Sequence, residues 1–372
     1  MRARVLLFAL ALGAASPAAA GPWDDVAHPN RRRCTQLVAD AAKLGEAHEW
    51  KMAASSARTA AALCPSDRAV LLHAGETLLG AREYADGRRQ LERARALGDA
   101  APVAHDDDLS LAFLLGFARE VTGDLDGAIE EHRRLEAMGG LPSPNQYLVH
   151  YNLGDELMAA GRLAEAIDEY RRAVTLAGAK PVVRLALAVA LDRDEQVDQA
   201  RVELAGVLAF DPELRSLATE DYVFVPREDV YYYRALALAE RGATAEARLE
   251  LRRFIAELPS GPYVAHAKRR LAVTEERVDP RELEVSPGVD KGALARALGP
   301  VVRELEGCFA AGRLTRVKLQ IAPGALRALP EHPAGECLDR ALSRVDARLF
   351  ATVHSGSVEL PLAGRRAAPS AP

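Results

Sequence analysis

The four cysteines are the residues whose positions say most about chemistry. Cys34 and Cys64 stand near the two ends of an expected helical hairpin, and Cys308 and Cys337 stand in the last quarter of the chain. No C-x-x-C pair occurs, so neither a redox motif nor a structural zinc site is indicated. Because the two ends of an antiparallel hairpin are neighbours, we predict a Cys34–Cys64 disulfide, which leaves Cys308 to pair with Cys337. Buried free thiols are the alternative.

A histidine and three carboxylates stand in sequence at His105, Asp106, Asp107 and Asp108. These side chains are of the types that bind calcium or a transition metal, but consecutive residues cannot all converge on one ion. Carboxylates are also favoured at the positive N-terminal end of a helix. We therefore predict an acidic helix start with Asp108 as its cap, and no metal or cofactor.

No catalytic motif is found among the remaining polar residues. None of the nine histidines stands in a nucleophile–base arrangement, and the G-x-S-x-G, Walker and dinucleotide-binding patterns are absent. We therefore predict no catalytic residue. The alternative is an enzyme whose active-site loop is the segment 213–229, with its acid–base pair drawn from Glu220, Asp221, Glu228 and Asp229. Those carboxylates are more typical of helix starts.

Composition and the first residues bound the class of protein. The chain has 372 residues, 49% hydrophobic and 5% aromatic, with a net charge of -5, so there is no electrostatic case for nucleic-acid binding. Residues 1–20 combine early arginines, a short apolar run and an A-x-A site, which predicts a signal peptide cleaved near Ala20. We expect a periplasmic or secreted protein with no membrane span, in an oxidising compartment.

A repeated pattern of small residues predicts how most of the chain is built. Gly154 and Ala166 are expected on facing sides of a helical hairpin, where small side chains let two backbones approach closely, and Gly161 falls at the turn between the helices. Comparable positions recur along the chain, twice at a spacing of 34 residues. We predict six units, at 34–67, 68–101, 109–142, 147–180, 181–212 and 228–261, followed by a capping helix at 262–277.

This period and these small positions resemble the tetratricopeptide repeat. The resemblance implies an α-solenoid of helical hairpins over 34–277, whose first helices line a concave groove that binds a partner peptide or protein. By family position, the groove residues are Phe113, Phe117, Leu148, Tyr151, Asp155, Leu185, Val189, Tyr232 and Leu236. The alternative is that these side chains pack on one another or on the insertion 213–229.

The last hundred residues have a different pattern. Two prolines in 278–290 predict a linker or an edge segment. Residues 291–364 read as helix, hairpin, helix and strand, a small α/β domain in which Pro300 breaks or starts the first helix. The cysteines of Cys308-Phe309 and Cys337-Leu338, with Leu360-Pro361-Leu362 in the last strand, resemble the C-terminal domain of the AgmX and PglI gliding-motility proteins, which is similar to that of TonB. Residues 365–372 are expected to be a disordered tail.

These features predict a mainly α protein that acts as an exported, non-enzymatic interaction scaffold. Its partner is expected to be a protein or peptide of the cell envelope, held in the groove of the repeats. In a second hypothesis, the chain is a cell-envelope assembly or gliding-motility accessory that docks through its C-terminal domain.

Overall fold

The computed structural model describes residues 30–98, 105–139, 141, 145–178, 180–218, 224–322, 324–346 and 355–365. The chain divides into two compact units. The first comprises Met1–Val183 and Thr219–Val225, and the second comprises Arg184–Ala218 and Pro226–Pro372. The predicted signal peptide lies outside the described residues.

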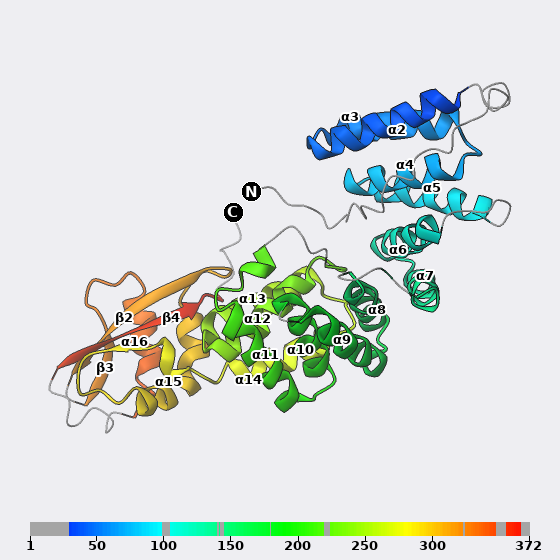
Figure 1. Cartoon of the computed structure of the whole chain (residues 1–372). Coiled ribbons are helices and arrows are strands. Elements are labelled where there is room, and N and C mark those ends of the chain that lie inside the picture. The colour runs from blue at the N-terminus through cyan, green and yellow to red at the C-terminus, as the bar shows by residue number, and fades with distance from the viewer. Residues whose placement is uncertain are drawn as a thin grey trace. The chain divides into compact units, whose positions relative to one another are not determined.

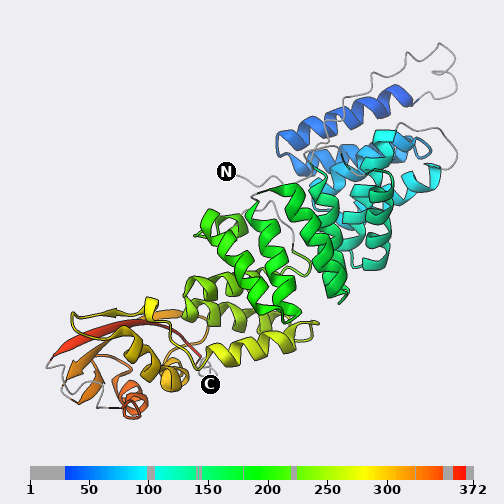
Figure 2. The same cartoon turned by 60° about the horizontal axis from the view of Figure 1, so that its bottom comes forward.

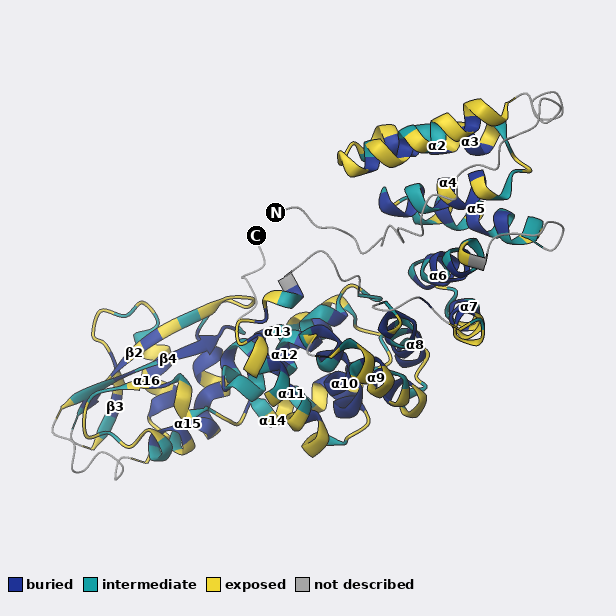
Figure 3. Ribbon diagram, viewed as in Figure 1, coloured by how far each residue is buried: buried dark blue, intermediate teal, exposed yellow. Residues whose placement is uncertain are grey.

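The first unit consists of four helical hairpins that follow one another along the chain. Each hairpin packs on the next, and buried residues face the neighbouring helices while exposed ones lie on the outside (Figures 1 and 3). The helices are α2 (Arg31–Glu46), α3 (Trp50–Leu63), α4 (Arg68–Gly80), α5 (Tyr84–Leu97), α6 (His105–Val121), α7 (Leu125–Ala137), α8 (Tyr147–Ala159) and α9 (Leu163–Ala177).

The small residues lie where the paired helices touch, as predicted. A Cβ atom added to Gly75 in α4 would lie 2.6 Å from Leu91 of α5 and 3.2 Å from the carbonyl oxygen of Gly87. A Cβ atom on Gly154 in α8 would lie 2.5 Å from the ring of Tyr170 in α9. Real Cβ contacts are essentially never this short, so both positions require glycine in this packing.

The turns inside the hairpins depend less on glycine than the sequence indicates. Gly161 has a φ of 77° after α8, in the left-handed region that glycine adopts without strain. His48, Arg82 and Glu195 adopt φ values of 61° to 62° in other turns. A side chain in this region costs about 1–2 kcal/mol, so these turns are stabilised by the helices that they join.

The second unit begins with further helices. They are most of α10 (Pro181–Arg193), α11 (Val197–Phe210), the 3₁₀ helix η2 (Arg215–Ala218), α12 (Asp229–Arg241), α13 (Thr244–Glu257) and α14 (Val264–Thr274). Helix α13 packs against both α12 and α14. Helix α14 occupies the position predicted for a capping helix.

A four-stranded antiparallel sheet completes the second unit. Its strands are β1 (Glu284–Val285), β2 (Leu314–Ala322), β3 (Ala325–Ala328) and β4 (Gly356–Ala363), in the order β1-β4-β2-β3. Along β2, the side chains of Val317, Leu319 and Ile321 are buried and the intervening ones are exposed, so along this strand one face of the sheet is covered and the other is open. Helices α15 (Lys291–Glu306) and α16 (Gly335–Leu342) supply that cover (Figure 2). The predicted order of helix, hairpin, helix and strand is present.

Of the two predictions for 278–290, the edge segment is confirmed and the separate linker is corrected, because these residues pack into the fold and β1 forms one edge of the sheet. Leu283 is 0% exposed in the core of the sheet, and Glu284 and Val285 pair with Glu359 and Val358 of β4. The preceding 3₁₀ helix η3 (Pro280–Glu282) is attached to the repeats, because Glu282 accepts a hydrogen bond from the backbone N–H of Ala245 at 2.8 Å. The expected break at Pro300 is also wrong, since α15 continues through it.

A buried ion-pair cluster ties the sheet to the last repeat. Arg248 of α13 is 1% exposed and Glu306 of α15 is 0% exposed, with Nε and Oε1 2.7 Å apart. Arg252 of α13 donates to the Ala363 carbonyl at 2.8 Å and pairs with Glu275 at 3.0 Å. Repeat and sheet therefore form one compact unit rather than two separated domains. Of the expected tail, only Arg365 lies among the described residues, and it pairs with Glu275.

Both predicted disulfides are formed. Cys34 and Cys64 join α2 to the residue that follows α3, with Cα atoms 6.4 Å apart, and Cys308 and Cys337 join the end of α15 to α16, with Cα atoms 5.8 Å apart. The first bond closes the outermost described hairpin, which has a neighbour on one side only. It is the place in a helical array where a covalent link adds most to local stability.

Candidate functional site

A pocket of about 370 Å³ opens on the helical part of the second unit. Its walls come from the end of α10, from α11, from α12 and from α14, and its far side is the segment Arg277–Arg281 that leads into the sheet. Pockets that take small ligands or side chains have volumes of about 300–1,000 Å³. The pocket is therefore large enough to receive a few side chains of a partner.

Aliphatic side chains form part of the lining of this pocket. Val197 at the start of α11 is 39% exposed, and Val273 on α14 is 51% exposed. Leu204 and Leu236 also line it, and Leu204 is fully buried. Leu236 is a predicted groove residue, and it is partly exposed. The pocket thus offers an apolar surface to a ligand.

Asp192, at the end of α10, anchors one side of the pocket. Its carboxylate is 0% exposed and accepts hydrogen bonds from the hydroxyl of Tyr232 and, at 3.0 Å, from Nε2 of His266. Arg270 also pairs with it. Burial and the neighbouring arginines lower the pKa of His266. Three helices, α10, α12 and α14, therefore meet at one carboxylate, which fixes the position of Arg270 in the pocket wall.

Three further arginines surround the opening. Arg201 pairs with Glu240 at 3.2 Å, and Arg281 makes two hydrogen bonds of 2.8 and 2.9 Å to Asp279. Those bonds lower the pKa of the Asp279 carboxyl. Arg277 is exposed and forms no ion pair with another described residue. The lining therefore carries four arginines against three carboxylates.

The structure separates the nine predicted groove residues into three groups. Leu185, Val189 and Tyr232 are at most 1% exposed, which corrects their assignment to an open groove. Phe113, Leu148 and Tyr151 are buried with 6–9% of their surface exposed, and Phe117, Asp155 and Leu236 are partly exposed. Binding of a partner by the last two groups stays a prediction.

Tyr232 shows why family position alone misplaces a groove residue. Its hydroxyl donates to Asp192, its ring lies 5.5 Å from that of Phe254 and 6.1 Å from that of His266, and Arg193 stacks 4.9 Å from its centroid. Burial raises the pKa of Tyr232. The capping helix α14 brings His266 over this position, so the tyrosine belongs to the core.

The insertion 213–229 packs against the fold over the part that the structure describes. Asp211 accepts hydrogen bonds from the backbone N–H groups of Arg215 and Ser216, both at 2.8 Å, and these bonds start η2. Asp229 lies in the first turn of α12 and pairs with the buried Arg193 at 2.9 Å. Glu228 lies at the N-cap of α12, whereas Glu220 and Asp221 lie outside the described residues. The described carboxylates of this segment thus stand at helix starts.

The acidic stretch His105–Asp108 also stands at a helix start, but the predicted role of Asp108 as the cap is corrected. Helix α6 begins at His105, so Asp108 lies in its first turn rather than at the cap. Asp108 pairs with Arg68 of α4, which links two successive hairpins.

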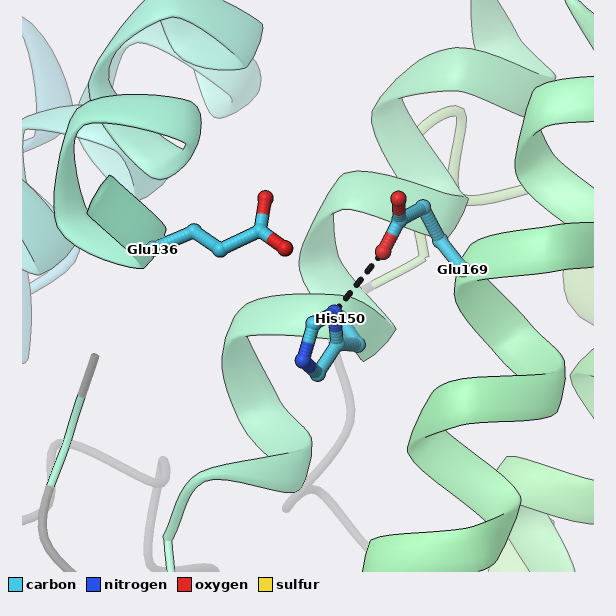
Figure 4. A group of neighbouring side chains, drawn as sticks. All are labelled: Glu136, His150 and Glu169. Atoms are coloured by element: carbon cyan, nitrogen blue, oxygen red, sulfur yellow. Dashed lines mark hydrogen bonds and ion pairs between the residues drawn. The ribbon is translucent and has the colours of Figure 1, made fainter. Parts of the chain in front are cut away.

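Glu136, His150 and Glu169 come together from α7, α8 and α9, and the three side chains point toward one another (Figure 4). One nitrogen or oxygen atom of each lies within 4.8 Å of the others, and Nδ1 of His150 is 2.7 Å from Oε2 of Glu169. These are metal-ligating residue types. Arg172 pairs with Glu136 at 3.3 Å and with Glu169 at 3.1 Å. Arg172 thus already neutralises part of the charge of the two carboxylates. We therefore interpret the three residues as part of an ion-pair cluster that joins two hairpins.

A second buried polar cluster, which the sequence does not reveal, lies between α6, α7 and α8. His132 and Glu156 are 0% exposed, with Nδ1 and Oε1 2.6 Å apart, and Glu120 is 6% exposed. Burial raises the pKa of Glu120, and the neighbouring carboxyl groups of Glu156 and Asp155 raise it further. Burial also raises the pKa of Glu156 and lowers that of His132 to about 4. The pair is therefore held in its neutral form.

The comparisons with known proteins bear on the helical part of the chain. Residues 157–219 match the tetratricopeptide repeat family. This match runs from the end of α8 to η2, and it includes Leu204 and Arg201 of the pocket wall. No curated protein matches the chain.

Solved structures with stacked tetratricopeptide helices also match. MamA AMB-1 is 21% identical with a TM-score of 0.40, and the match covers 49% of this chain and 93% of MamA. A second MamA structure is 16% identical with a TM-score of 0.41, covering 52% of this chain and 98% of that one. YrrB, described as "a TPR protein with an unusual peptide-binding site", is 18% identical with a TM-score of 0.36, covering 58% of this chain and 99% of its own.

Among the described helices, none combines the length and the apolar character that a bilayer-spanning segment needs.

Proposed function

We propose that this chain is an exported, non-enzymatic interaction scaffold that binds a partner protein at the pocket of the second unit. The observation that carries the proposal is the exposure of two aliphatic side chains, Val197 of α11 and Val273 of α14, in the lining of one preformed pocket. Apolar side chains in such a position gain stability when a partner covers them, at about 25 cal/mol per Å² of apolar surface removed from water. Pockets of this kind hold a partner segment without making or breaking a bond.

Export to the periplasm or the exterior is part of the proposal. The apolar run of residues 1–20 has the order of a signal peptide. Two disulfides in one chain also favour an oxidising compartment, because cytosolic thiols are kept reduced. Processing near Ala20 and an envelope partner follow from this placement. N-terminal sequencing of the mature protein tests the cleavage.

Site-specific photo-crosslinking tests the binding site. A photoreactive amino acid replaces Val273 in the pocket, or Val202, which is 69% exposed on α11 and does not line the pocket. After irradiation of the producing cells, we expect a defined crosslinked product for position 273 and none for position 202. Equal products at both positions, or none at 273, would remove the pocket from the proposal.

A second candidate function is docking through the C-terminal sheet, as in envelope-assembly or gliding-motility accessories with an AgmX- or PglI-like domain. The observation in its favour is the uncovered face of the sheet, where Arg316, Lys318 and Gln320 of β2 are exposed. A photoreactive residue at position 318 distinguishes the two candidates. A product at 318 without one at 273 favours docking by the sheet.

A further inference from the structure

We propose that the pocket of the second unit selects an acidic partner segment, one that presents a carboxylate beside an aliphatic side chain. This inference rests on the proposed function and adds the chemistry of the partner to it.

Each carboxylate of the lining is already paired within the protein. Asp192 is surrounded by Tyr232, His266 and Arg270. Asp279 is held by two hydrogen bonds from Arg281, and Glu240 pairs with Arg201. None of these three negative charges is left to attract a cation of a partner.

Two arginines of the pocket lining, by contrast, remain able to bind a carboxylate of a partner. Arg277 is exposed at the rim and has no carboxylate partner among the described residues. Arg201 is 63% exposed, whereas its partner Glu240 is 25% exposed, so the guanidinium reaches solvent beyond the carboxylate. Two arginine forks are therefore accessible at the pocket rim, and the fork geometry of arginine matches a carboxylate with two parallel hydrogen bonds.

The arginines require a carboxylate on the ligand, and the aliphatic side chains of the lining require an apolar side chain beside it. Val197 and Val273 line the same pocket as these arginines, so a ligand that is charged along its whole length would leave them without an apolar partner. The net charge of the whole chain is -5, so it gives no general attraction for acidic molecules, and a preference for them must come from this local lining. A segment in which aspartate or glutamate alternates with leucine or valine satisfies both requirements.

The test is fluorescence anisotropy with the full-length protein and three labelled octapeptides that share their leucines and valines. The intervening positions are aspartate and glutamate in the first peptide, serine in the second and lysine in the third. We expect the acidic peptide to bind about tenfold more tightly than the basic one, with the neutral peptide between them. Since the rim is exposed, the preference should shrink as ionic strength rises.

Two variants with matched controls assign the effect to the pocket. Arg277→Glu should weaken binding of the acidic peptide about fivefold and leave the neutral peptide unchanged, while Arg253→Glu, an exposed arginine of α13 outside the lining, should change neither. Val273→Asp should weaken both peptides, while Val202→Asp should weaken neither.

The outcomes separate the inference from the proposed function. Equal binding of the three peptides, no binding, or a preference that survives Arg277→Glu overturns acidic selection. Tighter binding of a single-stranded 12-mer DNA than of the acidic peptide overturns it as well. In each of these cases a crosslinked product at position 273 would still support the scaffold. Loss of that product alone would count against the scaffold at this pocket.

Discussion

Replacement of Gly154 by alanine should destabilise the hairpin of α8 and α9, although alanine is the better helix former. The added methyl group would lie 2.5 and 2.6 Å from two ring carbons of Tyr170, whereas ordinary contact begins at 3.4 Å. The ring would have to retreat by about 1 Å, which is the kind of overpacking that costs about 1–3 kcal/mol. Tyr170 cannot move freely, because it is 0% exposed and its hydroxyl donates to Asp155 at 2.6 Å.

Helix propensity acts in the opposite direction on the free energy of unfolding. Alanine in place of glycine stabilises a helix interior by about 1 kcal/mol, and loss of the Tyr170–Asp155 hydrogen bond costs about 1 kcal/mol. The net expectation for Gly154→Ala is a loss of about 1–3 kcal/mol. Gly206 in α11 provides the matched control, because its nearest neighbour is the flexible side chain of Arg184 at 3.0 Å. Gly206→Ala should stabilise its helix by up to about 1 kcal/mol.

Native-state hydrogen exchange read by mass spectrometry measures both effects in the helices concerned, which avoids treating a chain of two units as one transition. Peptides from α8 and α9 should exchange faster in Gly154→Ala, and peptides from α11 should exchange more slowly in Gly206→Ala. The double change Gly154→Ala with Tyr170→Leu should restore part of the protection, because leucine removes the ring. Slower exchange in α8 of Gly154→Ala would refute the close approach of the two helices.

Three further predictions concern buried groups. Burial raises the pKa of Glu120, so the stability that the protonated Glu120 side chain contributes is fully present below the unfolded pKa and is lost as pH rises through the folded value. The stability advantage of Glu120→Gln over the natural chain, measured by urea unfolding, should therefore grow between pH 5 and pH 8. Replacing Cys34 and Cys64 by serine opens a loop with a sequence separation of 30 and should destabilise the first hairpin by about 3.6 kcal/mol, measured by hydrogen exchange in α2 and α3; protection equal to that of the natural chain would contradict this. Arg248→Met leaves the buried Glu306 short of a partner and should cost about 3 kcal/mol in thermal unfolding, most of which the double change with Glu306→Leu should recover.

The helical hairpins could be predicted from sequence because their determinants are local. A glycine or alanine at the contact of two helices and a turn at a fixed distance are visible in any window of the chain, as at Gly154 and Gly161. The sequence pattern predicts that the third unit begins at residue 109, because Asp108 is a favourable cap, whereas the helix begins at His105 and holds the three aspartates in its first turn. Helix ends are decided by such small differences, so they are the least predictable part of a helical element.

Of the residues that line the pocket, only Leu236 is among the groove residues predicted from the sequence. The arginines of the pocket are spread from Arg201 to Arg281, and an isolated arginine carries no motif that would join it to another. The contact that organises the site, His266 with Asp192, spans 74 residues and depends on how α14 lies over α10. The same contact explains why Tyr232 is buried. Family positions describe a repeat between two similar neighbours, and here a capping helix replaces one of them.

The two-residue strand β1 is also hard to predict from the sequence, and its position affects the pocket. Leu283 and Val285 pack into the sheet core from a segment whose prolines fit a linker as well as an edge segment. Directly before them, Glu282 binds the start of α13, and Arg277 and Arg281 line the pocket. Added side-chain volume at Gly299 in α15 would press on the Glu276 carbonyl, only 2.6 Å from the added Cβ. The pocket rim is therefore held from both sides, by the last repeat and by the C-terminal sheet. A change in the sheet core that loosens Leu283 should alter peptide binding without touching a residue of the pocket.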